Sequence, residues 1–170
     1  AGDTILVAAG TYTGLGAEVV MANKSIALSG GWNAAFTAHN GYSTIDGQNA
    51  RRGVYVNSSN VTTSLDRFII RNGYSSGYGG GVYNASGSLT ITNSSIYGNS
   101  VDKFNSGGGG IANDSGNMTL ENTTVNDNMA YVGGGIYNAN FKGNLILNNT
   151  TISNNSGSYG GGVYNSDGSV

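Results

Sequence analysis

The apolar residues of this chain recur in short segments in which two aliphatic side chains lie two positions apart. Such spacing is typical of a β-strand with one buried face, because successive side chains of a strand point to opposite sides. No segment of helical length shows the spacing of an amphipathic helix. The clearest apolar pairs are Leu89/Ile91, Met118/Leu120 and Leu145/Leu147. Gly, Asn and Ser, which accept turn conformations, separate the segments, so the pattern predicts an all-β protein of short strands.

A block of three glycines, an aliphatic residue, one further residue and Asn occurs four times. The blocks begin at Gly79, Gly108, Gly133 and Gly160, in steps of 29, 25 and 27 residues. A repeat of this length with three short strands and their turns predicts one coil of a parallel β-helix. A leucine-rich repeat would need a longer apolar consensus and a helical segment, and a propeller blade needs about 40 residues or more.

The repeat extends toward the N-terminus more loosely, through Ile70 and Ile45. We therefore expect a single β-helix domain over residues 1–170, with about six coils of 25–29 residues. The segment 30–42 exceeds the length of the repeat, so it is predicted to be a loop that projects from the stack.

Stacking gives equivalent positions of successive coils the same environment, so each column of the repeat should have one role. The aliphatic residue after the glycines should point inward and fill a shared core. The Asn that ends each block, and a second Asn that recurs once per coil, should form ladders in which each amide donates to the next. The inward column is Val82, Ile111, Ile136 and Val163, and the two ladders are Asn84, Asn113, Asn138 and Asn165, and Asn99, Asn128 and Asn155.

The composition excludes several classes of protein. Gly, Asn, Ser and Thr make up just over half of the 170 residues, and only 9% are charged, against about 25% in a typical soluble domain. The chain has no Cys, which excludes disulfides and Cys-ligated metals. The net charge is −2 and no basic patch is present, so nucleic acid is not an expected partner. The longest apolar stretches have four or five residues, too few for a membrane-spanning helix.

Two features resemble known families. The segment Gly2–Tyr12 (GDTILVAAGTY) resembles the opening coil of pectate-lyase-like, right-handed parallel β-helix proteins. The glycine blocks, with the Asn-Ser/Thr-Ser/Thr-aliphatic segments that follow them, are similar to repeats of bacterial surface β-helix proteins, among them polymorphic outer-membrane-protein passengers. The resemblance implies a right-handed, single-stranded parallel β-helix (β-solenoid) in an extracellular or cell-surface setting. It implies little about activity, because one fold carries many functions.

Polysaccharide-cleaving enzymes of the pectate-lyase-like fold need clustered acids with basic partners, since cleavage needs a positioned proton donor and acceptor. The best such cluster here consists of Asp46, Arg51, Arg52, Asp66, Arg67 and Arg71. Asp46 and Arg71 occupy equivalent places on adjacent coils and can pair. A surface ion pair is the simpler interpretation, and a sugar acid held by the arginines is the alternative. The single histidine, His39, lies in the predicted loop, and no catalytic residue is predicted.

Oxygen ligands that suit calcium occur at Asn126, Asp127 and Asn128, and near Asp102. The nonapeptide calcium repeat of toxin-type β-rolls is absent, and isolated acidic loops are usually solvated. Neither a metal site nor a cofactor is therefore predicted.

Tyrosines form a further column. Tyr83, Tyr137 and Tyr164 each follow an inward aliphatic residue and should point outward; Tyr55 extends the column, and Ala112 interrupts it. Exposed tyrosines in a row can stack on sugar rings or contact a neighbouring molecule. They can equally shield the glycine-rich backbone from water. The sequence leaves both interpretations open.

These observations favour a non-enzymatic, structural or adhesive β-solenoid of a bacterial surface, with carbohydrate as a candidate ligand. A solenoid has two open strand edges, and neither end of this sequence shows a polar cap. The expected partners are thus the rest of a longer chain, or further copies stacked end to end into a filament. The alternative is a polysaccharide-binding or polysaccharide-degrading, pectate-lyase-like enzyme with its groove near Asp46 and Arg71.

Overall fold

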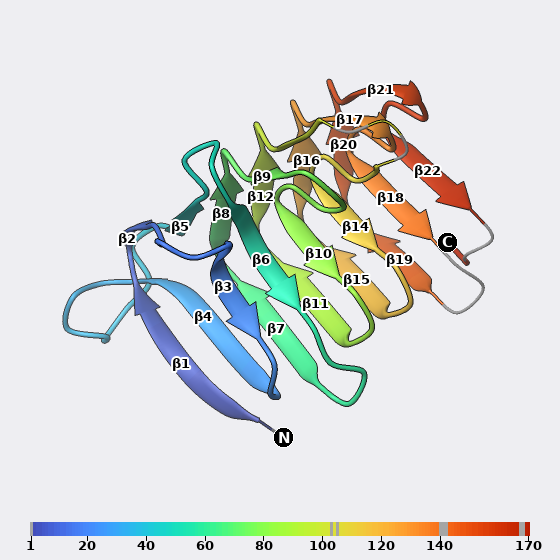
Figure 1. Ribbon diagram of the computed structural model, residues 1–170. Coiled ribbons are helices and arrows are strands. Elements are labelled where there is room, and N and C mark those ends of the chain that lie inside the picture. The colour runs from blue at the N-terminus through green and yellow to red at the C-terminus, as the bar shows by residue number, and fades with distance from the viewer. Residues whose placement is uncertain (1, 103, 105, 140–142, 167–168) are drawn as a thin grey trace.

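The computed structural model describes residues 2–102, 104, 106–139, 143–166 and 169–170, and in these residues the protein is all-β (Figure 1). The described residues contain twenty-two strands in four parallel sheets, which we name A, B, C and D. Each later coil passes from sheet A to sheet B, then to sheet D and finally to sheet C. The chain therefore winds about one axis in about six turns, as the repeat predicts.

Each sheet collects one strand from each coil. Sheet A contains β1 (Asp3–Ala8), β4 (Ile26–Trp32), β7 (Thr62–Asp66), β11 (Ser88–Thr92), β15 (Asn117–Glu121) and β19 (Asn144–Asn148). Sheet B contains β2 (Gly10–Tyr12), β5 (Ser43–Asp46), β8 (Phe68–Arg71), β12 (Ser95–Tyr97), β16 (Thr124–Asn126) and β20 (Thr151–Ser153). Sheet C contains β3 (Glu18–Ala22), β6 (Arg52–Val56), β10 (Val82–Asn84), β14 (Ile111–Asn113), β18 (Ile136–Ala139) and β22 (Val163–Ser166). Sheet D contains β9 (Tyr74–Ser75), β13 (Ser100–Val101), β17 (Met129–Val132) and β21 (Ser156–Tyr159).

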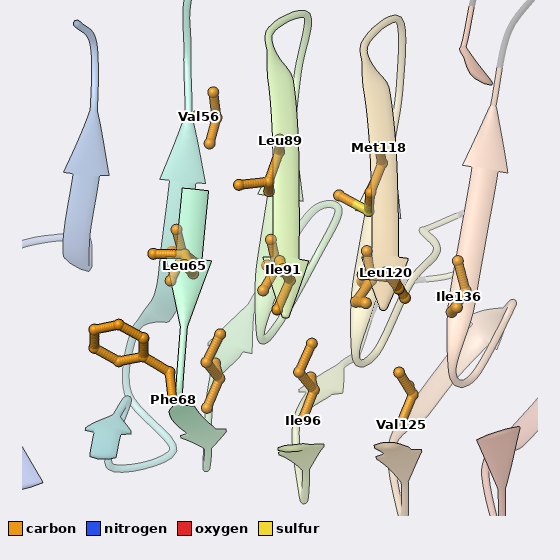
Figure 2. Packing of buried hydrophobic residues seen from close by; sticks show 14 of the residues in the cluster. Val56, Leu65, Phe68, Leu89, Ile91, Ile96, Met118, Leu120, Val125 and Ile136 are labelled. Atoms are coloured by element: carbon orange, nitrogen blue, oxygen red, sulfur yellow. The ribbon is translucent and has the colours of Figure 1, made fainter. Parts of the chain in front are cut away.

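The repeats stack in register, and this register builds the core. Val82 pairs with Ile111, Ile111 with Ile136, and Ile136 with Val163, so the unequal steps of the sequence are absorbed in the turns. The first three of these side chains are fully buried, and Val163 is partly buried. Figure 2 shows aliphatic side chains of successive coils side by side inside the stack, including Leu89 with Met118. Each coil buries few side chains alone, and stacking makes one continuous core.

Two amide ladders run along the stack, and they are buried except in the last coil. In sheet C the Nδ2 of Asn84 donates to Asn113 Oδ1 (2.9 Å), and the donation continues to Asn138 and Asn165 (2.8 Å each). At the turn between sheets B and D, Asn99 donates to Asn128 (2.9 Å) and Asn128 to Asn155 (3.0 Å). The buried members of the ladders therefore have hydrogen-bond partners inside the protein, where an unpaired amide would be costly.

The glycine blocks fit closely against the second ladder. The first glycine of each block has a positive φ, for example 74° at Gly108, which other residues rarely adopt. In the first three blocks a Cβ on the third glycine would collide with the ladder: at Gly110 it would lie 2.9 Å from Asn128 Nδ2. Close packing of the third glycine against the ladder Asn is therefore one reason why the two recur together in these blocks.

Asparagine also marks the turn between sheets A and B. One residue there has a positive φ in each of four coils: Arg67 (60°), Asn93 (48°), Asn122 (50°) and Asn149 (46°). Asn tolerates this left-handed conformation better than most residues, which accounts for part of its abundance.

The predicted loop at 30–42 is present, but it begins three residues later than expected. Gly30, Gly31 and Trp32 belong to β4, and Trp32 pairs with Ala8 of β1 after a shift in register. A Cβ at Gly30 would lie 2.6 Å from the Arg67 carbonyl oxygen, so this glycine permits a close approach of strands. Residues 33–42 then extend away from the stack (Figure 1).

Candidate functional site

The outer face of sheet C carries a row of tyrosines. The register aligns Tyr55 with Tyr83, Tyr83 with Ala112, Ala112 with Tyr137, and Tyr137 with Tyr164. The rings of Tyr55 and Tyr83 are parallel, with centroids 5.3 Å apart, and those of Tyr137 and Tyr164 are 5.9 Å apart. The column that the sequence predicted to face outward is thus a stack of rings along the axis of the solenoid.

Tyr78 fills the gap that Ala112 leaves in this row. Its ring lies 5.5 Å from that of Tyr137 and 6.3 Å from that of Tyr83. Ala112 beneath is only 1% exposed. The row is therefore continuous from Tyr55 to Tyr164, although one of its members comes from outside the column.

Arg52 holds the segment that carries Tyr78. Its Nε donates to the Gly79 carbonyl (2.9 Å), and its Nη2 donates to the carbonyl of Tyr78 and to Ser75 Oγ (2.9 Å each). Its guanidinium carbon also lies 5.1 Å from the centroid of Tyr55 and 5.2 Å from that of Tyr83. A guanidinium beside aromatic rings is a favourable cation–π arrangement, so Arg52 stabilises both the turn and the row.

The geometry limits what the row can do chemically. Burial, with the nearby Asp114 carboxylate, raises the pKa of Tyr83 to about 12, and burial together with Tyr78 raises the pKa of Tyr137. These phenols therefore remain neutral at physiological pH. Tyr83 and Tyr137 each lie between two other rings, so ring edges more than ring faces meet solvent. This geometry favours shielding of the backbone over stacking on sugar rings for these two residues.

Contacts beneath the rings support the same interpretation. A Cβ at Gly107 would lie 2.7 Å from Cγ of Tyr137, and one at Gly79 would lie 2.8 Å from Cβ of Tyr83. The tyrosines therefore pack directly on glycine backbone.

Beside the row is a hollow of about 200 Å³, lined by Tyr78, Tyr137, Tyr164, Ser106, Gly107, Val132 and Ser166.

We expect Tyr78→Ala to lower the free energy of unfolding by about 2 kcal/mol, because two ring contacts are lost and Ala112 is uncovered. Adding Ala112→Tyr should recover more than half of this loss, since position 112 aligns with Tyr83 and Tyr137. Ala112→Tyr alone should destabilise the protein, because Tyr78 occupies the space. Denaturant unfolding of the four proteins forms a double-mutant cycle. If the effects of the two substitutions are additive, the Tyr78 ring does not occupy the space that a tyrosine at position 112 would fill.

The Asp46 and Arg71 pair lies on sheet B. The two residues are aligned between β5 and β8, and Arg71 Nε donates to Asp46 Oδ2 at 3.0 Å. The same carboxylate accepts hydrogen bonds from the backbone N–H of Gln48 (2.9 Å) and from Asn72 Nδ2 (3.1 and 3.2 Å). Burial opposes ionisation, but these donors and the Arg71 charge outweigh it and keep the pKa of Asp46 below its usual value. Asp46 therefore fastens the turn after β5.

This arrangement predicts a contribution to acid stability. Because the pKa of Asp46 is lower in the folded chain, its ionised form contributes stability above the unfolded value of about 3.9. That contribution is lost as the pH falls through the folded pKa. Asp46→Asn should therefore make the free energy of unfolding depend less steeply on pH between about 5 and 2. Asp3→Asn, at an exposed site on β1, is the control and should retain the wild-type slope. An unchanged slope in Asp46→Asn would show that the carboxylate is not stabilised by folding.

The other sequence candidates are dispersed. The oxygen groups at 126–128, which suit calcium although the sequence predicts no metal site, do not converge: the Asn128 oxygen accepts from Asn99 inside the ladder, and the Asn126 amide donates to Asp127 on the surface. His39, in the loop, contacts Trp32 at the end of β4, with ring centroids 4.1 Å apart, and its Nδ1 is 3.0 Å from the Gly30 carbonyl oxygen. Within the described ranges, no three His, Cys, Asp or Glu side chains are grouped as metal ligands would be.

The fold and these surfaces define a parallel β-solenoid whose interior is built from repeated aliphatic and amide columns. The family described as "Right handed beta helix region" matches residues 15–170, and the chain belongs to that family. No curated protein and no solved structure matches the chain. Over the part of the chain that the structure describes, no helix is long and apolar enough to cross a membrane.

Proposed function

We propose that this chain is a non-enzymatic, structural and adhesive β-solenoid of a bacterial surface. The observation that carries the proposal is the pair of Asn ladders, in which side-chain amides hydrogen-bond from one coil to the next. One ladder runs from Asn84 to Asn165 and the other from Asn99 to Asn155. Such ladders fix each coil against the next, which suits a rod that has to keep its shape outside the cell. The resemblance of the glycine blocks to bacterial surface repeats supports the setting.

The state of Asp46 favours this function over the enzymatic alternative. In the enzymatic alternative, Asp46 would have to exchange a proton with the substrate, since acid–base cleavage needs a positioned proton donor and acceptor. Asp46 instead accepts hydrogen bonds from Gln48, Asn72 and Arg71, and its pKa is lowered. A carboxylate bound in this way is a poor proton donor.

The stacking geometry also supports an end-to-end partner. The last two coils pair in one register in each of the four sheets, so a coil from another copy, or from further along the same polypeptide, could pair in the same way as an internal one. Pairing of this kind does not close on itself and gives filaments.

Three measurements test the proposal together. Beads coated with the purified chain should adhere to a glycan- or cell-coated surface, and negative-stain microscopy should show rods or end-to-end assemblies. Incubation with pectin-like polymers should release no uronate. Release of uronate that Asp46→Asn abolishes would overturn the proposal in favour of the enzyme, and coated beads that adhere no better than beads coated with an unrelated protein would overturn the adhesive role.

A further inference from the structure

Three arginines are paired with carboxylates; they lie on β6, on β8 and in the turn before β8. Arg52 Nη1 lies 3.2 Å from Glu18 Oε1, Arg71 Nε lies 3.0 Å from Asp46 Oδ2, and Arg67 Nε lies 3.9 Å from Asp66 Oδ2. These pairs account for most of the arginine cluster found in the sequence.

Arg51 is different, since it has no carboxylate partner among the described residues. Its Nε donates to the Gly16 carbonyl (3.2 Å), and its Nη1 donates to Gln48 Oε1 (2.7 Å). Both acceptors are neutral, so the charge of the guanidinium is not compensated. The two contacts hold the side chain in place and leave its Nη2 edge without an acceptor in the described ranges. A fixed guanidinium edge of this kind suits bidentate binding of a carboxylate or sulfate group.

Arg51 also lines a hollow of about 270 Å³ that spans three successive coils. The backbone N–H of Tyr74 donates to the Arg51 carbonyl (2.9 Å), which ties two of these coils together at the hollow. The lining residues are Ala17, Ala50, Arg51, Arg52, Tyr74, Ser75 and Ser76. The hollow therefore combines one uncompensated cation with apolar, aromatic and hydroxyl groups.

The serines and the tyrosine add groups that would recognise a sugar. Ser75 Oγ accepts from Arg52 Nη2 (2.9 Å) and from the Gly77 N–H (3.1 Å), so its own proton remains available to donate. Ser76 beside it is exposed. The Tyr74 hydroxyl donates to Asp102 Oδ2 at 2.6 Å, which fixes the ring at the wall of the hollow. An aromatic wall with a few placed polar groups is typical of a small-ligand site.

We infer that this hollow binds an oxyanion, a carboxylate or sulfate, carried on a surface glycan. The anion would lie on the open edge of Arg51, with sugar hydroxyls near Ser75 and Ser76 and the sugar ring against Tyr74. The inference rests on the proposed adhesive function and specifies its ligand class. The site is separate from Asp46 and Arg71, where the guanidinium already has its carboxylate.

The test is a binding titration of the purified chain with three probes at fixed ionic strength: oligogalacturonate, dextran sulfate fragments and neutral dextran. At least one anionic probe should bind, and neutral dextran should not. Arg51→Gln should weaken that binding about tenfold or more, because a charge-assisted hydrogen bond is lost. Arg67→Gln removes the same charge from a turn between sheets A and B, and it should change the affinity less than about twofold. Thermal unfolding of both variants checks that they are folded.

The two anionic probes distinguish carboxylate from sulfate as the group bound. Equal weakening in Arg51→Gln and Arg67→Gln would show nonspecific attraction to charge and overturn the site. Binding of neutral dextran, or of no probe at all, would also overturn it. Adhesion of coated beads is measured separately: if Arg51→Gln beads adhere like wild-type beads, the surface function stands and this hollow does not serve it.

Discussion

Gly109→Ala should lower the free energy of unfolding by at least about 4 kcal/mol, among the largest effects of a single methyl group. A Cβ at this position would lie 2.3 Å from the Met129 carbonyl oxygen and 2.6 Å from that of Gly134. Both atoms belong to the backbone of the next coil, which is held by its own pairing and cannot move aside alone. The measurement is denaturant unfolding followed by circular dichroism.

Substitutions at two other glycines distinguish a steric clash from backbone strain as the cause of this loss of stability. Gly98 has a φ of 63°, and a Cβ there would lie 3.6 Å from its nearest neighbour, Asn72 Oδ1, so Gly98→Ala should cost only the left-handed backbone, about 1–2 kcal/mol. At Gly10 the nearest atom would be 3.9 Å away, and Gly10→Ala should change stability little. If Gly109→Ala is no more destabilising than Gly98→Ala, neighbouring coils are not as close as the structure places them.

The repeat made most of the fold predictable. Columns such as Val82 to Val163 and Asn84 to Asn165 could be placed because a solenoid puts every copy of a position in one environment. Spacing in the sequence therefore translated directly into contacts in space. The extracellular setting, the adhesive role and the absence of catalysis are not encoded in this spacing, and they remain proposals.

The features that the repeat did not reveal are those that break a column. Tyr78 completes the tyrosine row from outside it, and the only signal was the Ala at position 112 among tyrosines. Arg52 holds that segment by hydrogen bonds to backbone carbonyls. Contacts to the backbone cannot be predicted from the pattern of residue types. The sequence also grouped arginines and acids in one region. It did not show that, within the described residues, Arg51 is the one of these arginines without a carboxylate partner, because pairing depends on how the coils stack.

Asn128→Ala should lower the free energy of unfolding by about 3 kcal/mol or more, because it leaves several buried groups without partners at once. Its Oδ1 accepts from the backbone N–H of Asn99 (3.0 Å) and from Asn99 Nδ2 (2.9 Å). Its Nδ2 donates to the Ile96 carbonyl and to Asn155 Oδ1 (3.0 Å each). The residue is 1% exposed, so water cannot replace these bonds without opening the coil.

Asn126→Ala is the matched control, since this side chain lies two residues earlier on the outside of β16 and bonds to Asp127 on the surface. It should change stability by less than about 0.5 kcal/mol. Hydrogen exchange at the Asn99 amide should accelerate in Asn128→Ala and not in Asn126→Ala, because only the first removes its acceptor. Similar losses in both variants would mean that the buried ladder is no stronger than a surface amide contact. A rod held together by such contacts would lack the rigidity on which the structural role depends.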